Sequence, residues 1–264
     1  MVSIGHSSTH GDARVMHVAR IFTALRQTLP ALREFYQEIY RVTPIDLSKP
    51  GEPHSRLYPY PSSFQKDGLE VKFTFVRALE DDAGCVAFRA RTEGVEPQNI
   101  VVKFVSRYGV NVHKFLASRE LAPQLHYFGP LPGLVTSAAR PQDFLPLMYM
   151  VVMDYIEPSH TPDDARKQLE AALRMLHDER YVLGDLREPN ILFDENGKLK
   201  LIDFDWAGRY EKDTDHDASP VGDDCFARYP LGMSSDIRWP QGAGDLELIV
   251  PQHDIEMLDR FCPQ

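Results

Sequence analysis

Apolar residues in the N-terminal part of the chain recur every three or four positions between Asp12 and Tyr40. This spacing predicts an amphipathic helix whose apolar stripe consists of Val15, Val18, Ile21, Leu25, Leu29, Leu32, Phe35 and Ile39. Pro30 lies inside the pattern and predicts two helices or a kink, because proline has no N–H for the helical hydrogen bond. We expect the stripe to pack on the rest of the chain, with binding of a partner as the alternative.

Five prolines between residues 43 and 68 predict an irregular linker after this helix. Apolar and polar residues then alternate around 71–75 and 86–90, which predicts two strands. A run rich in β-branched residues predicts a third strand at 99–106, and a longer apolar run at 147–156 predicts a buried strand.

Three later segments have helical spacing. Residues 108–119 predict a short helix. A second helix is expected to start at Thr161, a capping residue that is followed by Pro162 and two acids, and to end near 178. Its buried face would consist of Ala165, Leu169, Leu173 and Leu176. The last helix is expected to begin at His253, with its inward face made of Ile255, Leu258 and Phe261.

Three polar side chains, Asp185, Asn190 and Asp203, accompany a predicted hairpin. Two short apolar runs between Asn190 and Asp203 flank Asn196-Gly197, a pair that tolerates the positive φ angles of a tight turn. The hairpin would return Asp203 to the side of Asn190. Such a pair of oxygen ligands suits Mg²⁺, which is usually held by one or two of them together with substrate phosphates. Asp185 would face the same site and accept a proton from a hydroxyl group.

Composition and charge narrow the class of protein. The chain has 264 residues, of which 26% are charged and 43% apolar, as in soluble globular proteins. A net charge of −10 without a basic cluster argues against nucleic acid as a partner. Three widely spaced cysteines suit a reducing compartment. Because no secretory signal is visible and the apolar run at 145–153 is too short for a bilayer, we expect a cytoplasmic protein without a membrane partner.

The residues that resemble known sequence motifs are concentrated in the segment 181–208. D-L-R-E-P-N at 185–190 resembles the catalytic loop of protein kinases, and I-D-F-D at 202–205 resembles the D-F-G motif that follows it. The thirteen-residue step from Asn190 to Asp203 is also typical of that fold. The segments GDLREPNIL, LIDFDWAG, RYPL and HDIEML resemble a group of small fungal kinase-like proteins close to the aminoglycoside and choline phosphotransferase branch. The resemblance runs from about residue 70 to the end.

This resemblance implies an α+β, bilobal protein-kinase-like fold. Residues 1–68 would be an N-terminal helical extension and linker. Residues 69–153 would form an N-lobe with an antiparallel sheet, and residues 154–264 a short, mostly helical C-lobe. The implied cofactors are ATP and Mg²⁺.

The resemblance also implies a role for each matching residue. Asp185 would be the catalytic base, and Arg187 would neutralise the transferred phosphoryl group, as a lysine does in protein kinases. Asn190 and Asp203 would hold Mg²⁺. Asp254 would hydrogen-bond the backbone of the catalytic loop.

Three further residues would bind the nucleotide. Lys103, in V-V-K-F on the third strand, would pair with the α- and β-phosphates, although a lysine within a strand is usually solvated. The backbone groups of Asp154 and Ile156 would meet the edge of adenine, beside Met153 at the back of its pocket.

The chain departs from the kinase pattern at four places. Leu183 replaces the histidine that precedes the catalytic aspartate in kinases. The turn at 80–84 has one glycine and three acids where a glycine-rich phosphate loop is expected. Val110 stands where kinases have a helix carboxylate that pairs with the lysine. Glu120 lies beyond the expected end of the helix and would be a poor substitute. His113 would contact a phosphate instead. Asp205 replaces the glycine of D-F-G and would add a charge, or a further ligand, beside the metal.

These features leave three functions open. The first is an ATP-Mg²⁺-dependent phosphotransferase, similar to serine/threonine protein kinases, that transfers phosphate to a hydroxyl group of a protein or a small molecule. The second is a pseudokinase that senses nucleotide or acts as a scaffold. The third is a small-molecule kinase of the aminoglycoside phosphotransferase type.

Overall fold

The computed structural model describes residues 9–42, 58–80, 86–131, 148–210 and 226–261. The chain divides into two compact units, Met1–His54 and Ser55–Gln264. Most of the expected phosphate loop, residues 81–84, lies outside the described residues.

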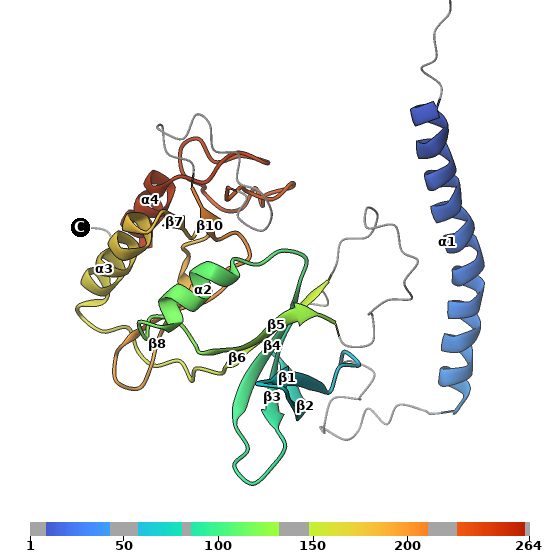
Figure 1. Ribbon diagram of the computed structural model, residues 1–264, viewed down its shortest axis with the longest axis horizontal. Coiled ribbons are helices and arrows are strands. Elements are labelled where there is room, and N and C mark those ends of the chain that lie inside the picture. The colour runs from blue at the N-terminus through green and yellow to red at the C-terminus, as the bar shows by residue number, and fades with distance from the viewer. Residues whose placement is uncertain (1–8, 43–57, 81–85, 132–147, 211–225, 262–264) are drawn as a thin grey trace, which may run out of the picture. The chain divides into compact units, whose positions relative to one another are not determined.

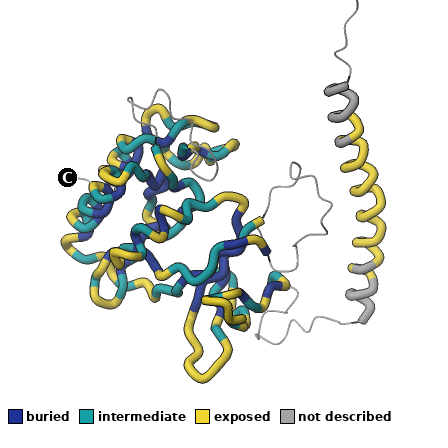
Figure 2. The backbone as a smooth tube through the Cα atoms, viewed as in Figure 1, coloured by how far each residue is buried: buried dark blue, intermediate teal, exposed yellow. Residues whose placement is uncertain are grey.

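The first unit contains one helix, α1 (Thr9–Val42), which continues through Pro30. Of the two predicted alternatives, the one with two separate helices is therefore wrong. Proline at position 30 removes one hydrogen bond, to the carbonyl group of Arg26, and the turns on either side maintain the helix. Every described side chain of α1 is exposed, including the apolar ones (Figure 2).

The second unit is built on a six-stranded antiparallel sheet with the strand order β1-β2-β3-β4-β6-β5 (Figure 1). Its strands are β1 (Ser63–Lys66), β2 (Leu69–Ala78), β3 (Ala87–Thr92), β4 (Asn99–Val105), β5 (Leu125–Pro130) and β6 (Tyr149–Asp154). The strands expected at 71–75, 86–90, 99–106 and 147–156 are confirmed, whereas β5 was not anticipated. One face of the sheet buries a cluster that includes Phe64, Phe73, Phe88, Ile100, Val102, Met150 and Val152.

The predicted linker at 43–68 is wrong at its C-terminal end, where β1 pairs with β2. Asp67 and Gly68 connect the two strands with φ angles of 51° and 79°. An Asp-Gly pair with two positive φ angles is typical of a two-residue hairpin turn. Phe64 anchors β1, because its ring is buried against Phe73 of β2. The Asp-Gly pair was the local signal for this hairpin.

The helices of the second unit are α2 (Val110–Ala117), α3 (Ala165–Asp178) and α4 (Pro251–Phe261), of which α3 and α4 lie side by side (Figure 1). They share a second buried cluster with the segment 183–207. The predicted inward face of α3 is confirmed, since its four apolar residues are buried: Ala165, Leu169, Leu173 and Leu176.

Three predicted helix details are wrong. The helix α4 starts at Pro251, not at His253. The side chain of Phe261, predicted to face inward, lies outside the described residues. The helix α3 starts after Asp164, not at Thr161, because a turn closed by the bond from the Ala165 N–H to the Pro162 carbonyl precedes it. On α4, Ile255 is 40% exposed, since the buried face is occupied by Asp254, Met257 and Leu258.

Two short two-stranded sheets complete the unit. One pairs β7 (Tyr181–Val182) with β10 (Gly208–Arg209), and the other pairs β8 (Ile191–Phe193) with β9 (Leu199–Leu201). A single 3-10 turn, Glu188–Asn190, leads into β8. These elements frame the segment that contains Asp185, Asn190 and Asp203.

Candidate active site

The predicted hairpin forms, and it brings the chain after β9 back to Asn190. Ile191 lies opposite Leu201, and the Ile202 N–H donates to the carbonyl oxygen of Asn190 at 3.0 Å. The turn differs from the prediction, because Gly197 has a positive φ of 71° and Asn196 does not. Instead, the Asp194 carboxylate accepts the N–H groups of Asn196 and Lys198 at 2.9 and 3.0 Å and closes a wider turn.

Asp185 and Asn190 are in direct contact and are buried. The Asn190 amide nitrogen donates to the Asp185 carbonyl oxygen at 2.9 Å and to its Oδ2 at 3.1 Å. Arg187 binds the same carboxylate with Nε on Oδ1 and with Nη2 on Oδ2, the latter at 2.8 Å. Because the amide nitrogen of Asn190 is used in this way, its Oδ1 is the atom that remains for the expected metal. Among the described residues, no hydrogen bond involves that oxygen.

The loop before Asp185 is held by α4. Asp254, which is 1% exposed, accepts the backbone N–H groups of Leu183 at 3.0 Å and Gly184 at 2.8 Å. His177 Nε2 is 3.1 Å from the same carboxylate. Gly184 has a φ of 79°, and a Cβ atom there would lie 2.5 Å from Ile249 Cδ1. The expectation that Asp254 hydrogen-bonds the backbone of this loop is therefore confirmed.

Lys103 reaches the same segment from the sheet. Its ammonium group donates to Asp203 Oδ1 at 2.8 Å and to Asp205 Oδ1 at 2.7 Å. Lys103 is 7% exposed and lies opposite Val151 of β6. The alternative of a solvated lysine is therefore wrong. About a hundred residues of chain separate the ammonium group from its partners, so this contact is entirely tertiary.

The protonation states of this cluster follow from burial and charge. Burial opposes the charge of Lys103, but Asp203 and Asp205 outweigh it and raise its pKa. Burial also opposes the charge of Asp203, and Lys103 outweighs it, so that the pKa of Asp203 is lowered. Burial and the neighbouring Asp203 raise the pKa of Asp205 despite Lys103. Asp203 therefore holds the more stable of the two negative charges.

Burial also raises the pKa of Asp185, although Arg187 and Asn190 act in the opposite direction. A carboxylate whose pKa is raised binds a proton more readily, which suits a general base. The bidentate Arg187 must share or release the carboxylate before a hydroxyl group can approach it.

The backbone is strained at Asp203, which has a φ of 63°. A non-glycine residue in the left-handed region costs roughly 1–2 kcal/mol, and such residues cluster at functional sites. The ring of the next residue, Phe204, is fully buried. It stacks on His113 of α2, with 4.6 Å between ring centroids.

His113 has a structural role, so the expected contact with a phosphate is wrong. The side chain is fully buried, with Nδ1 2.7 Å from the Tyr108 hydroxyl and Nε2 2.8 Å from the Pro123 carbonyl oxygen. Burial lowers the pKa of His113 to about 4. The ring is therefore neutral at pH 7, accepting from the tyrosine and donating to the carbonyl group.

The helix carboxylate that pairs with the lysine in kinases has no equivalent among the described residues of α2. Val110 begins the helix, and Glu120 is on the surface, 3.1 Å from Lys198. Instead, Asp205 binds Lys103 directly. Sequence reasoning treated Asp205 as an added charge beside the metal and missed this contact, for which the sequence has no local signal.

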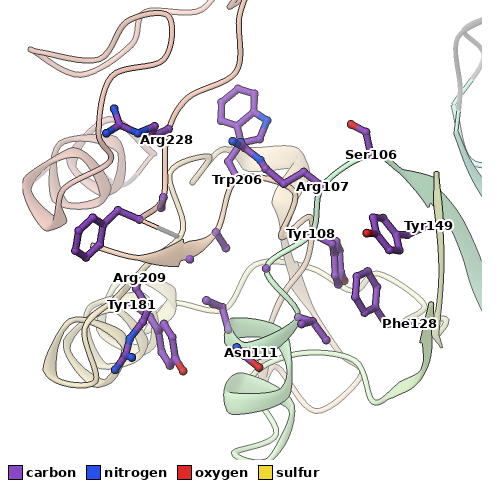
Figure 3. A pocket seen from close by; sticks show the side chains of 17 residues that line it. Ser106, Arg107, Tyr108, Asn111, Phe128, Tyr149, Tyr181, Trp206, Arg209 and Arg228 are labelled. Carbon is purple, nitrogen blue, oxygen red and sulfur yellow. The ribbon is translucent and has the colours of Figure 1, made fainter. Parts of the chain in front are cut away.

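A cavity of about 440 Å³ lies beside the first turn of α2 (Figure 3). The stacked rings of Tyr108, Phe128 and Tyr149 form one wall, and Arg107 and Trp206 lie across from them. None of its 17 lining residues is acidic. Lys103, Asp185, Asn190 and Asp203 do not line it, so this cavity is separate from the polar cluster.

The expected adenine contacts lie at the end of β6. Met153 is buried, and the Asp154 N–H donates to the Gln124 carbonyl at 3.0 Å. The Asp154 carboxylate is 2.6 Å from His126 Nε2. Within the described part of the chain, no hydrogen bond involves the Ile156 N–H, which leaves it as a donor.

A comparison with protein families bears on the segment that contains this cluster. Residues 147–227 match the family model of the protein kinase domain. The match supports a protein-kinase-like fold for a chain that is α+β with an antiparallel sheet. It begins just before β6, ends at Ala227 and includes Asp185, Asn190 and Asp203. A search of the curated proteins found no match to the chain.

The donor set fits a hard cation only in combination with a substrate. Among the described residues, no three His, Cys, Asp or Glu side chains gather as a metal site would require. Asn190 and Asp203 supply oxygen atoms, so that phosphate oxygens would have to complete the shell. No helix in the described ranges is both long and apolar enough to cross a membrane.

Proposed function

We propose that this protein is an ATP-Mg²⁺-dependent phosphotransferase with a bilobal protein-kinase-like fold. The two buried clusters, one on the sheet and one shared by α2, α3 and α4, would be the cores of the two lobes. The observation that carries the proposal is the contact of Lys103 from the sheet with Asp203, the residue that follows the hairpin from Asn190. The protein kinase match over 147–227 supports it.

Each side chain has a task in phosphoryl transfer, which depends on positioning and on neutralising charge. Asp185 accepts the proton of the acceptor hydroxyl, and Arg187 neutralises the transferred group. Lys103 binds the α- and β-phosphates, exchanging part of its contact with Asp203 and Asp205 for them. Magnesium held by Asn190 Oδ1 and Asp203 would neutralise negative charge on the phosphates.

The backbone at the end of β6 would bind adenine. The Ile156 N–H is the donor, and the Asp154 carbonyl is the acceptor. The acceptor substrate is a protein or small-molecule hydroxyl group, and the small-molecule alternative would resemble aminoglycoside phosphotransferases.

Measurement of ADP release with ATP and Mg²⁺ tests the proposal. We expect turnover in the wild type and a loss of at least about 100-fold in Asp185→Asn, because a general base contributes roughly 10²–10⁴-fold. Glu188→Gln is the matched control, since Glu188 is an exposed acid three residues away. Equal turnover in wild type and Asp185→Asn would remove Asp185 from the mechanism.

A nucleotide-binding module without catalysis is the second candidate, and a specific observation favours it. Lys103 is neutralised by two carboxylates, and Asp185 is paired with Arg187, so that the charges of the site are already satisfied within the chain. A thermal shift with ATP and Mg²⁺ distinguishes the candidates, because a ligand at 100 times its Kd adds about 2.7 kcal/mol of stability. A shift without any ADP release would favour the module.

A further inference from the structure

The exposed apolar surface of α1 has a strict seven-residue repeat. Positions a of the repeat are Val15, Phe22, Leu29 and Tyr36, and positions d are Val18, Leu25 and Leu32. All seven side chains are apolar or aromatic, and each is between 43% and 67% exposed. In Figure 2, the described residues of α1 are coloured as exposed, and none of them is buried.

The repeat predicts the geometry in which this helix would pack on a second helix. A straight helix drifts by about 20° per heptad from a seven-residue repeat, and a left-handed supercoil around a second helix removes the drift. An apolar a/d pattern sustained over three to four heptads is typical of a coiled coil. The side chains at positions a and d form the seam of such a pair. Pro30 lies at position b, outside this seam, so its ring does not enter the contact.

The area of the seam is sufficient for a stable pair. Seven large side chains, each with about half of its surface exposed, offer roughly 600 Å² per helix, or roughly 1,200 Å² for two helices. That value lies at the lower end of specific protein interfaces. A helix of 34 residues is about 51 Å long, which accommodates the full seam.

The charged residues at positions e and g favour a parallel orientation of two paired helices. In a parallel pair, position g of one helix faces position e of the other, which places Ile21 opposite Arg26 and Thr28 opposite Arg33. No like charges meet in these pairs. An antiparallel pair would set the e positions of the two copies against each other, so that arginines repel.

We infer that α1 is a dimerisation helix, which pairs in parallel and in register with α1 of a second copy of this chain. A second copy carries the same repeat over the same length, which satisfies the seam from end to end. The inference does not depend on the proposed function.

The test uses the full chain and its mass in solution, measured by light scattering or sedimentation between 1 and 100 µM. We expect a dimer for the wild type and at least a tenfold weaker dimer for the double variant Leu25→Lys, Leu32→Lys. The control is Met16→Lys with Ala31→Lys, because these exposed residues lie at b and c, off the seam. Circular dichroism checks the helix content of each variant.

Two results would overturn the inference. The first is a monomeric wild type, whether α1 then packs within its own chain or binds lipid vesicles. The second is an equal effect of both double variants, which would indicate association without a seam.

Orientation is tested by Val18→Cys, which should form an interchain disulfide under mild oxidation beyond the wild-type background, since paired d positions bring the Cα atoms within bonding reach. A dimer that does not cross-link there would refute the parallel register.

Discussion

The buried carboxylate of Asp254 offers the sharpest test of how the loop before Asp185 is held. It accepts two backbone N–H groups, at 3.0 and 2.8 Å, in a region where Leu183 and Gly184 are buried. Asp254→Asn keeps the shape but replaces one acceptor oxygen by an amide group that donates. One N–H then faces another donor, and an unsatisfied buried donor costs about 1–3 kcal/mol.

We therefore expect Asp254→Asn to lower the free energy of unfolding by about 2–3 kcal/mol, and Asp254→Ala by about 4 kcal/mol, since both donors then lose their partner. The assay is urea unfolding at pH 7.5, followed by the fluorescence of Trp206 and Trp239. With a slope of about 2 kcal/mol per molar urea, the midpoint should fall by about 1 M in Asp254→Asn.

The matched control is Asp259→Asn on the same helix. Asp259 pairs with Arg166 at 2.6 Å, and its side chain is 54% exposed, so the loss should stay within about 0.5 kcal/mol. Hydrogen exchange adds a local readout, because the amides of Leu183 and Gly184 should exchange faster in Asp254→Asn. The reasoning is refuted if Asp254→Asn unfolds at the wild-type urea concentration with both amides still protected.

Three further predictions concern stability. The pKa of His113 is about 4 in the folded protein and about 6.5 in the unfolded chain. As the pH is lowered below about 6.5, the unfolded chain therefore binds a proton before the folded protein does, and the free energy of unfolding decreases. When the pH is lowered from 7.5 to 5, the free energy of unfolding of His113→Gln, measured by urea titration, should decrease by about 2 kcal/mol less than that of the wild type. An equal decrease in both proteins would contradict this. Asp205→Asn should leave the melting temperature unchanged or higher, since burial and Asp203 raise the pKa of Asp205; a lower value would mean that its pair with Lys103 is net stabilising. Gly109→Ala should cost about 1–3 kcal/mol because its Cβ would lie 2.4 Å from the Ala207 carbonyl oxygen, whereas Gly244→Ala, with no atom closer than 3.6 Å, should be neutral.

Local patterns in the sequence predicted the elements that carry the site. Alternation identified two strands of the sheet, and runs of β-branched or apolar residues identified two more. The hairpin after Asn190 followed from two apolar runs around Asn196-Gly197. These features depend on residues a few positions apart, whose side-chain period and backbone preferences act within one element. The Asp67-Gly68 hairpin was predictable on the same grounds.

Only the tertiary structure identified the groups that contact the buried polar side chains. Lys103 binds Asp205 as well as Asp203, and His113 stacks on Phe204 instead of contacting a phosphate. Neither contact has a local signal, because the partners lie far apart in the chain and meet only where residues 203–205 approach β4 and α2 in the folded unit. The inward side of α4 was likewise decided by what it packs on, with Asp254 buried and Ile255 exposed.

The sequence by itself determined where carboxylates, an amide and a lysine occur, and which short elements carry them. The tertiary structure decided which charges meet. An ammonium group in a protein interior is stable only beside carboxylates, and the distance from Lys103 to Asp203 and Asp205 is set by the packing of two buried clusters. That packing is a property of the whole folded unit, so no single segment of the sequence contains it.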